Sequence, residues 1–386
     1  MPSRKKKIAV IFGTRPDTIK LAPIILDLQK HPHYRAINIA TAQHRHMLDQ
    51  VLDVFRIKPD YDLNIMEPKQ SLARLTKNVI AALDDALVDC KPDMVLVQGD
   101  TTTTFVGSLA AFYRQIPVGH VEAGLRTQDK ANPFPEEINR RLTSCIADLH
   151  FAPTATAKKA LLREHIPSRQ IFVTGNTVID ALRYSIKKTY RFSDARVNEY
   201  VREGRRIILL TMHRRENWGL PMIGACEAVR TLAKRYPDDR FVFPVHLNPI
   251  VREVVYPILG NLKNVILIEP LPYSEFVNLM ARSYLILTDS GGVQEEGPSL
   301  GKPVLVLRKV TERPEAVEYG TVKLVGLSPS KITSSAIALL DDAWSYKRMA
   351  SAVNPYGDGH ASRRTIQVLE HFFQFTRNKP TEFRPR

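Results

Sequence analysis

The sequence has 386 residues, of which 44% are hydrophobic and 25% are charged, an ordinary composition for a globular protein of two domains. The formal net charge of +15 favours anionic ligands, but the basic residues are dispersed and no zinc-finger or RNA-binding aromatic pattern accompanies them, which disfavours nucleic-acid binding. Three widely spaced cysteines argue against a disulfide framework, and no apolar run approaches the ~20 residues of a membrane span, so we expect a cytoplasmic protein.

Short apolar runs alternate with amphipathic stretches along both halves of the chain. This alternation is typical of βα units and predicts an α/β fold with doubly wound parallel sheets. The predicted strands of the first half are Ile8–Phe12, Ile37–Ala42, Met94–Gln98, Val118–Val121 and Leu149–Ala152. Those of the second half are Ile207–Thr211, Phe241–Pro244, Val265–Ile268, Leu285–Thr288 and Val304–Leu307. Helices are predicted over Thr18–Gln29, Leu72–Val88, Val277–Ala281 and Ser362–Phe375.

A polar, charged stretch, Lys187–Arg206, separates the two series of strands and is interpreted as the join between two similar halves. In doubly wound folds, ligands bind outside the carboxyl ends of the strands. Residues that directly follow a predicted strand are therefore the first candidates for a functional site.

In the first half, such residues are charged. Arg15 and Lys20 lie at the start of the first helix, where two cations could hold a diphosphate, although an ordinary turn with exposed charges is an equal alternative. Asp100, Glu122 and Glu136 come from successive βα units and should reach one rim of the sheet. Helix capping and helix-dipole complementation are the alternatives for Asp100 and Glu136. Carboxylates crowded into one cleft raise each other's pKa values, which suits acid–base chemistry.

In the second half, His213 follows a strand together with arginines that could contact a diphosphate, and surface solvation is the alternative. The turn Ser290–Gly292 follows another strand and opens a helix, so its amides can bind phosphate. Glu296, about one turn further, can reach a ribose diol. Neither the P-loop pattern nor the GxGxxG pattern of nicotinamide enzymes is present, and His44 and His46 have no third partner for a metal.

The whole set of motifs resembles the non-hydrolysing UDP-N-acetylglucosamine 2-epimerase family, over nearly the full chain. The segments that carry the resemblance are Phe12–Pro16, Thr41–Arg45, Gly99–Thr104, Gly119–Arg126, Thr174–Asp180, His213–Glu216, Pro244–Pro249, Asp289–Glu296, Thr311–Ala316 and Asn354–Gly359.

The resemblance implies a GT-B-like fold of two Rossmann-type domains with the active site in the cleft between them. We expect one domain over residues 1–175, joined by a returning helix over 360–386, and a UDP-binding domain over 176–359. The implied activity is reversible C2 epimerisation of UDP-GlcNAc to UDP-ManNAc by elimination and re-addition of UDP, with no cofactor and no metal. A GT-B glycosyltransferase and a hydrolysing epimerase that releases ManNAc are the alternatives.

The resemblance also assigns residues to roles. For catalysis it implies Asp100, Glu122, Glu136 and His213. For substrate and UDP binding it implies Arg15, Lys20, Phe276, Ser290, Gly291, Gly292, Glu296 and Arg313. A second UDP-GlcNAc, acting as an activator, would contact Gln43, His44, Gln70, Glu137, Arg214 and His246. A homodimer is expected. Two residues depart from the family pattern: Leu271 replaces a glutamine near the nucleotide, and Met212 replaces a small residue before His213.

Overall fold

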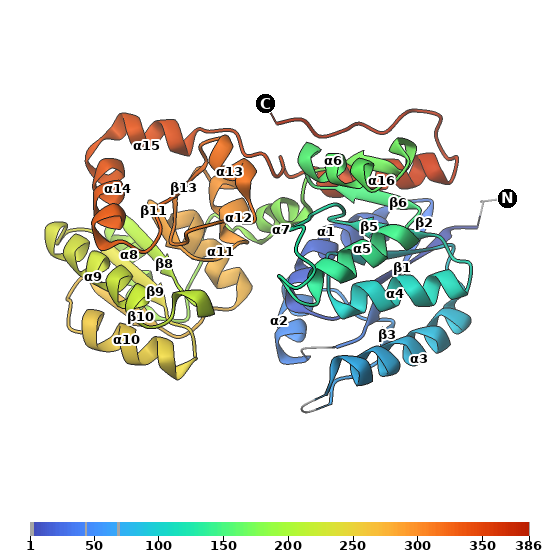
Figure 1. Ribbon diagram of the computed structural model, residues 1–386, viewed down its shortest axis with the longest axis horizontal. Helices are drawn as coiled ribbons and strands as arrows, with labels where there is room; N and C mark the ends of the chain where they lie inside the picture. Colours follow the sequence, from blue (N-terminus) through green and yellow to red (C-terminus); the bar gives the residue numbers. More distant parts are fainter. Residues whose placement is uncertain (1–3, 43–44, 68–69, 386) are drawn as a thin grey trace. The chain divides into compact units, whose positions relative to one another are not determined.

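The computed structural model describes residues 4–42, 45–67 and 70–385 (Figure 1). The chain divides into two compact units. The N-terminal unit consists of Met1–Tyr184 and Tyr356–Pro385, and the C-terminal unit consists of Ser185–Pro355. Each unit contains one parallel sheet with helices between its strands, so the predicted fold class, two Rossmann-like domains of the GT-B type, is confirmed.

The N-terminal unit has a seven-stranded sheet in the order β3-β2-β1-β4-β5-β6-β7. Its strands are continuous apolar runs, because a parallel sheet in an α/β fold is covered on both faces. The strands are β1 Lys6–Phe12, β2 Tyr34–Ala40, β3 Tyr61–Asp62, β4 Met94–Gln98, β5 Val118–Val121, β6 Leu149–Ala152 and β7 Ile171–Val173. The helices are α1 Arg15–Lys30, α2 Arg45–Phe55, α3 Leu72–Cys90, α4 Thr102–Tyr113, α5 Glu136–Ile146, α6 Ala155–Arg163, η1 Ser168–Gln170, α7 Thr177–Ser185 and α16 Ala361–Phe372.

The C-terminal unit has a six-stranded sheet in the order β10-β9-β8-β11-β12-β13. Its strands are β8 Ile207–Thr211, β9 Arg240–Pro244, β10 Val265–Ile268, β11 Leu285–Thr288, β12 Val304–Val306 and β13 Val322–Leu324. Its helices are α8 Ala195–Glu203, η2 Arg215–Asn217, α9 Leu220–Arg235, α10 Pro249–Leu259, α11 Tyr273–Arg282, α12 Val293–Ser299, α13 Pro314–Glu318, α14 Pro329–Asp341 and α15 Ala343–Ala350.

Both sheets reverse their winding direction at one pair of central strands. The reversal lies between β1 and β4 in the N-terminal unit and between β8 and β11 in the C-terminal unit. At such a point the loops on the two sides turn away from each other and leave a crevice at the carboxyl ends of the strands. In the N-terminal unit, α1 packs against α2 and α16, while α4 packs between α3 and α5. The topology therefore defines one expected site in each unit.

The polar stretch in the middle of the chain directly follows the boundary between the two units. The stretch Lys187–Arg206 is not only a join, because it contains helix α8 and belongs to the C-terminal unit. The Asp194 side chain accepts a hydrogen bond from the first turn, and Gly204 ends the helix in the left-handed conformation. Because α8 is largely polar and buries only Val197, it has too little apolar content to be recognised as a helix that packs on the core.

Candidate active site

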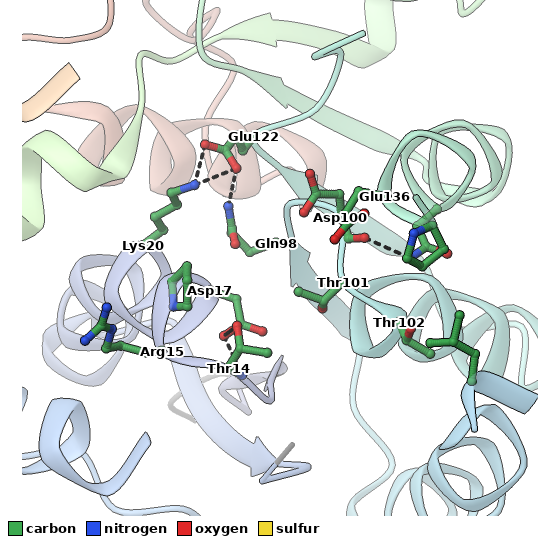
Figure 2. A pocket seen from close by; sticks show the side chains of 14 residues that line it. Thr14, Arg15, Asp17, Lys20, Gln98, Asp100, Thr101, Thr102, Glu122 and Glu136 are labelled. Atoms are coloured by element: carbon green, nitrogen blue, oxygen red, sulfur yellow. Dashed lines mark hydrogen bonds and ion pairs between the residues drawn. The ribbon is translucent and has the colours of Figure 1, made fainter. Parts of the chain in front are cut away.

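A cavity of about 470 Å³ lies at the carboxyl ends of β1, β4 and β5 in the N-terminal unit. Figure 2 shows side chains that line it. Arg15 and Lys20 come from α1, Asp100 follows β4, Glu122 follows β5, and Glu136 begins α5. The structure thus brings five of the candidate residues to one cavity, because parallel strands present their carboxyl ends at the same edge of the sheet.

Three side chains hold the carboxylate of Glu122 in this cavity. Lys20 Nζ lies 2.6 Å from its Oε1 and 2.8 Å from its Oε2. Gln98 Nε2 donates to Oε2 at 2.6 Å, and Asn176 Nδ2 donates to Oε1 at 2.9 Å. Its backbone φ of 63° lies in the left-handed region, which a non-glycine residue adopts at a cost of about 1–3 kcal/mol. One cation and two amides therefore fix a charged carboxylate on a strained backbone turn.

Asp100 is held by a different cation. Arg140 donates to Asp100 Oδ2 from Nε at 2.9 Å and from Nη2 at 2.5 Å. The Asn139 side chain also donates to the backbone carbonyl of Asp100 at 2.9 Å. Arg140 and Asn139 both come from α5, so this helix sets the position of the residue that follows β4.

Glu136 differs from the other two carboxylates. It occupies the first turn of α5, and among the described residues its buried Oε2 has no hydrogen-bond partner. An oxygen in this situation can accept a bond from a ligand or carry a proton. The three carboxylates thus line one cavity but have three different environments.

The start of α1 is occupied by the protein's own carboxylate. Asp17 accepts hydrogen bonds from the backbone N–H groups of Gly13, Thr14 and Thr18 at 3.1, 2.7 and 2.8 Å. Burial raises the pKa of Asp17 to about 6, although these bonds oppose the shift. Since Asp17 uses these helix N–H groups, an anion in this cavity would meet the side chains of Arg15 and Lys20 rather than the helix end.

The C-terminal unit has its candidate residues at the ends of β8 and β11. Fully buried Asp289 accepts from the backbone N–H of His213 at 2.9 Å and lies 3.2 Å from His213 Nδ1. Asn217 Nδ2 also donates to Asp289 Oδ2, the oxygen that accepts from the His213 backbone, at 2.9 Å. Asp289 therefore orients the His213 ring beside the turn Ser290–Gly292.

The glycine turn itself is lined by charged side chains. The Glu312 carboxylate lies so close that a Cβ built on Gly291 would be 2.8 Å from its Oε1. Glu312 pairs with Arg214 at 3.3 Å and with Arg308 at 2.5 Å. Burial disfavours its charged form, but Arg313 and Arg308 hold the pKa of Glu312 below its ordinary value.

The other nucleotide-site candidates lie on α11, on α12 and beside α13. Arg313 forms an ion pair with Glu295, the residue before the buried Glu296 on α12. Phe276 lies half-buried on α11. Of the two departures, Met212 is buried in the core of the unit and Leu271 is half-buried. The extra volume of Met212 is therefore taken up by the core beneath the strand end.

The residues predicted for an activator are spread over several environments. Gln43 and His44 lie outside the described residues. Gln70 donates to the carbonyl of Ile65 at 3.4 Å. The Glu137 side chain is 0% exposed and bonds to Arg140, Arg141 and the backbone of Thr127. In the C-terminal unit, the His246 ring stacks on the His213 ring with 6.0 Å between centroids.

Sequence reasoning did not assign several residues that hold the candidates in place. Gln98, Asn176 and Arg140 bond to carboxylates 24, 54 and 40 positions away, and no local spacing reveals such contacts. Asp289 had a signal, since it directly follows a buried strand. Over the part of the chain that the structure describes, no group of three or more His, Cys, Asp or Glu side chains could hold a metal ion, and no helix is long and apolar enough to span a membrane.

Comparison with known proteins decides the family. A family model described as UDP-N-acetylglucosamine 2-epimerase matches residues 26–370. The UDP-N-acetylglucosamine 2-epimerase of Bacillus subtilis is 54% identical over 380 residues, which cover 98% of this chain and 99% of the relative. The chain therefore belongs to the UDP-N-acetylglucosamine 2-epimerase family. This finding confirms the resemblance inferred from the motifs.

Solved structures of other family members have the same fold. The Neisseria meningitidis UDP-GlcNAc 2-epimerase, bound to UDP-GlcNAc, is 53% identical, with a TM-score of 0.84 and coverage of 94% of this chain and 99% of that chain. The Methanocaldococcus jannaschii UDP-GlcNAc 2-epimerase, in complex with UDP-GlcNAc and UDP, is 36% identical, with a TM-score of 0.76 and coverage of 95% and 99%. Epimerase-family members thus keep this architecture over nearly the whole chain.

Proposed function

We propose that this member of the epimerase family interconverts UDP-GlcNAc and UDP-ManNAc in the cytoplasm, without hydrolysing them and without a redox cofactor or metal. The observation that carries the proposal is the cavity of the N-terminal unit, where Asp100, Glu122 and Glu136 gather with Arg15 and Lys20. Family membership and the nucleotide-sugar complexes of relatives support the choice of substrate.

The chemistry explains why several carboxylates are needed. The hydrogen on C2 of the sugar is not acidic, because no carbonyl activates it. In the proposed reaction, the bond between C1 and the UDP oxygen breaks, the electron pair leaves with UDP, and C2 gives its proton to a carboxylate. The C2–H electron pair forms the double bond of 2-acetamidoglucal. The UDP oxygen then attacks C1 again while a carboxylic acid protonates C2 on its other face.

We assign the proton transfers to Asp100 and Glu122, with Glu136 in support. Each of these two carboxylates is held by its own cation, Asp100 by Arg140 and Glu122 by Lys20, which supports the assignment, because a group that transfers a proton must be fixed in position. Glu136, with its buried oxygen open for a proton or a ligand bond, suits a supporting role at the same cavity.

The departing diphosphate is assigned to other residues. Cations and backbone amides aimed at developing negative charge are an effective way to stabilise a leaving group. The residues proposed for this role are Arg15, His213, Arg313 and the turn Ser290, Gly291 and Gly292. Phe276 and Glu296 are proposed to hold the nucleoside. The contact with Asp289, which orients the imidazole ring of His213, supports the proposal that His213 binds the diphosphate.

A second UDP-GlcNAc is proposed as an activator, and the protein is proposed to be a homodimer. Within the C-terminal unit, the activator candidates lie beside the substrate candidates: His246 stacks on His213, and Arg214 pairs with Glu312 next to Gly291. This proximity supports a functional link between the two groups of residues.

The test is incubation of the purified protein with UDP-GlcNAc alone, followed by NMR of the sugar products. The proposal predicts a stable mixture of UDP-GlcNAc and UDP-ManNAc. Release of free ManNAc and UDP would identify a hydrolysing epimerase. A protein that consumes UDP-GlcNAc only when a sugar acceptor is added would be a glycosyltransferase, and either result would refute the proposal.

A further inference from the structure

Two of the motifs have no role in the reaction so far, and they contact each other. The segment Thr174–Asp180 follows β7, and Asn354–Gly359 contains the point where the chain re-enters the N-terminal unit. The backbone N–H of Asn176 donates to the carbonyl of Tyr356 at 2.6 Å. A Cβ on Gly175, which has a φ of 84°, would come within 3.4 Å of the Gly357 Cα. Glycine in both motifs therefore lets the two backbones touch.

The side chain of Asn176 contacts Glu122, which lines the cavity. Its Oδ1 accepts a hydrogen bond from the backbone N–H of Val178 at 3.1 Å. Because a backbone N–H can only donate, this bond fixes the orientation of the amide. The amide nitrogen must then face Glu122, and it lies 2.9 Å from Oε1. Asn176 is itself buried, so the bond is shielded from water.

Asn354, the first residue of the second motif, still belongs to the C-terminal unit and bonds within it. Asn354 Nδ2 donates to the carbonyl of Glu295 at 2.9 Å and to the hydroxyl of Ser299, and both acceptors belong to α12. Only one residue, Pro355, separates Asn354 from Tyr356. The chain therefore carries a short path of hydrogen bonds from the helix with Glu296 to the carboxylate of Glu122.

We propose that Asn176 is a positioning residue that holds the Glu122 carboxylate in its reactive orientation and anchors it to the re-entering segment Asn354–Tyr356. The proposal rests on the proposed function, because Glu122 must be one of the reacting carboxylates. Asn176 acts through Glu122 and not on the substrate. A change in how Asn354 binds α12 is then passed on to the catalytic carboxylate through two hydrogen bonds.

The main test is Asn176→Ala, which removes the donor to Glu122. Loss of a hydrogen bond to a charged group predicts a fall in kcat of about 10- to 100-fold. The KM for UDP-GlcNAc and the Kd for UDP should change by less than about twofold, because the lost bond is to Glu122 and not to a residue proposed for nucleotide binding. The acidic limb of the kcat profile should move to higher pH, because Glu122 with fewer donors takes up a proton more readily.

A double-mutant cycle separates positioning from general destabilisation. In the background of Glu122→Gln, Asn176→Ala should lower kcat by less than about threefold, because the effects of two substitutions that act through the same carboxylate are not additive. Asn354→Ala should lower kcat in the wild-type background and have no effect in that of Asn176→Ala. The matched control is Asn38→Ala, which removes another buried amide side chain of the N-terminal unit, one that donates to the backbone carbonyl of Lys58. This control should leave kcat unchanged.

If Asn176→Ala does not fold, Asn176→Asp keeps the shape and tests the same bond. Its carboxylate would face that of Glu122, so activity should be low at pH 8 and recover toward pH 5, where a shared proton restores the bond. The positioning role would be overturned if Asn176→Ala lowered kcat as much in the Glu122→Gln background as in the wild type. It would also be overturned if the loss of activity in Asn176→Asp were the same at every pH. A wild-type protein that makes no UDP-ManNAc would instead refute the proposed function.

Discussion

The Lys20–Glu122 ion pair allows a quantitative test of how the site is held together. Lys20 Nζ lies 2.6 Å from Glu122 Oε1, and the two side chains are only 18% and 6% exposed. The substitution Lys20→Met keeps most of the side-chain length and removes the charge. Removing one partner of a buried pair costs about 3–5 kcal/mol, because it leaves the other charge uncompensated. Since Gln98 and Asn176 still donate to Glu122, we expect the lower value, about 3 kcal/mol at pH 8.

The assay is urea unfolding of the wild type and the variant at pH 8 and pH 5. At pH 5, the Glu122 of the variant can take up a proton and lose its uncompensated charge, so the deficit in unfolding free energy should shrink by about 1 kcal/mol or more. Lys6→Met is the control, because the Lys6–Asp93 pair has a similar distance of 2.9 Å but exposures of 39% and 26%. That pair should be worth less than about 1 kcal/mol. Equal losses in the two variants, or a deficit in Lys20→Met that ignores pH, would refute the reasoning.

Three further predictions concern residues beside the site. Burial raises the pKa of Asp17 from 3.8 to about 6, so its contribution to stability is present below about pH 4 and is lost as the pH rises through 6. Relative to Asp17→Asn, the wild type should lose about 2 kcal/mol of unfolding free energy between pH 4 and pH 7 in urea titrations. Asp289→Asn removes the negative charge that faces the His213 ring and favours its protonated form. The alkaline limb of the pH profile of kcat should therefore move to lower pH, and an unchanged limb would contradict the assigned contact. Gly124→Ala should lower the unfolding free energy, measured by thermal unfolding, by more than about 3 kcal/mol, because its Cβ would collide with a backbone carbonyl of α6. The control Gly204→Ala, which has open space around it, should lower the unfolding free energy by only about 1 kcal/mol. Similar losses in the two variants would contradict the predicted collision.

The strands could be predicted closely from the sequence, for a physical reason. Strands buried on both faces are continuous apolar runs, and β4, β5, β6, β8, β10 and β11 have the predicted bounds. The strands β3, β7 and β13 were missed because each has only two or three residues and none is buried throughout, whereas β12, also of three residues, is fully buried and was predicted. Helix α8 was missed because it is largely polar.

The position of the site follows from topology, but its internal contacts do not. Arg15, Lys20, Asp100, Glu122 and Glu136 all follow strands or begin helices at one edge of a sheet, so their common cavity could be anticipated. Which cation meets which carboxylate depends on side-chain packing across many tens of residues and leaves no signal in local spacing. The roles assigned to these residues stay predictions.

For the residues predicted to contact an activator, the motif likewise gives the residue type but not its packing. The resemblance to the family predicts that Glu137 contacts a second nucleotide sugar, yet its carboxylate is fully buried between Arg140 and Arg141. Arg140 also holds Asp100, so Glu137 can affect the position of Asp100 through this shared partner. Burial of this kind depends on how α5 packs, which the motif alone does not specify.

The most direct test of the central claim is the fate of the hydrogen on C2 when the reaction runs in deuterated water. Elimination and re-addition with proton transfer by Asp100 and Glu122 predicts deuterium at C2 of the UDP-ManNAc formed by the wild type. Asp100→Asn and Glu122→Gln should greatly slow this incorporation. UDP-ManNAc that keeps its original C2 hydrogen, or wild-type rates of incorporation in both variants, would contradict the account.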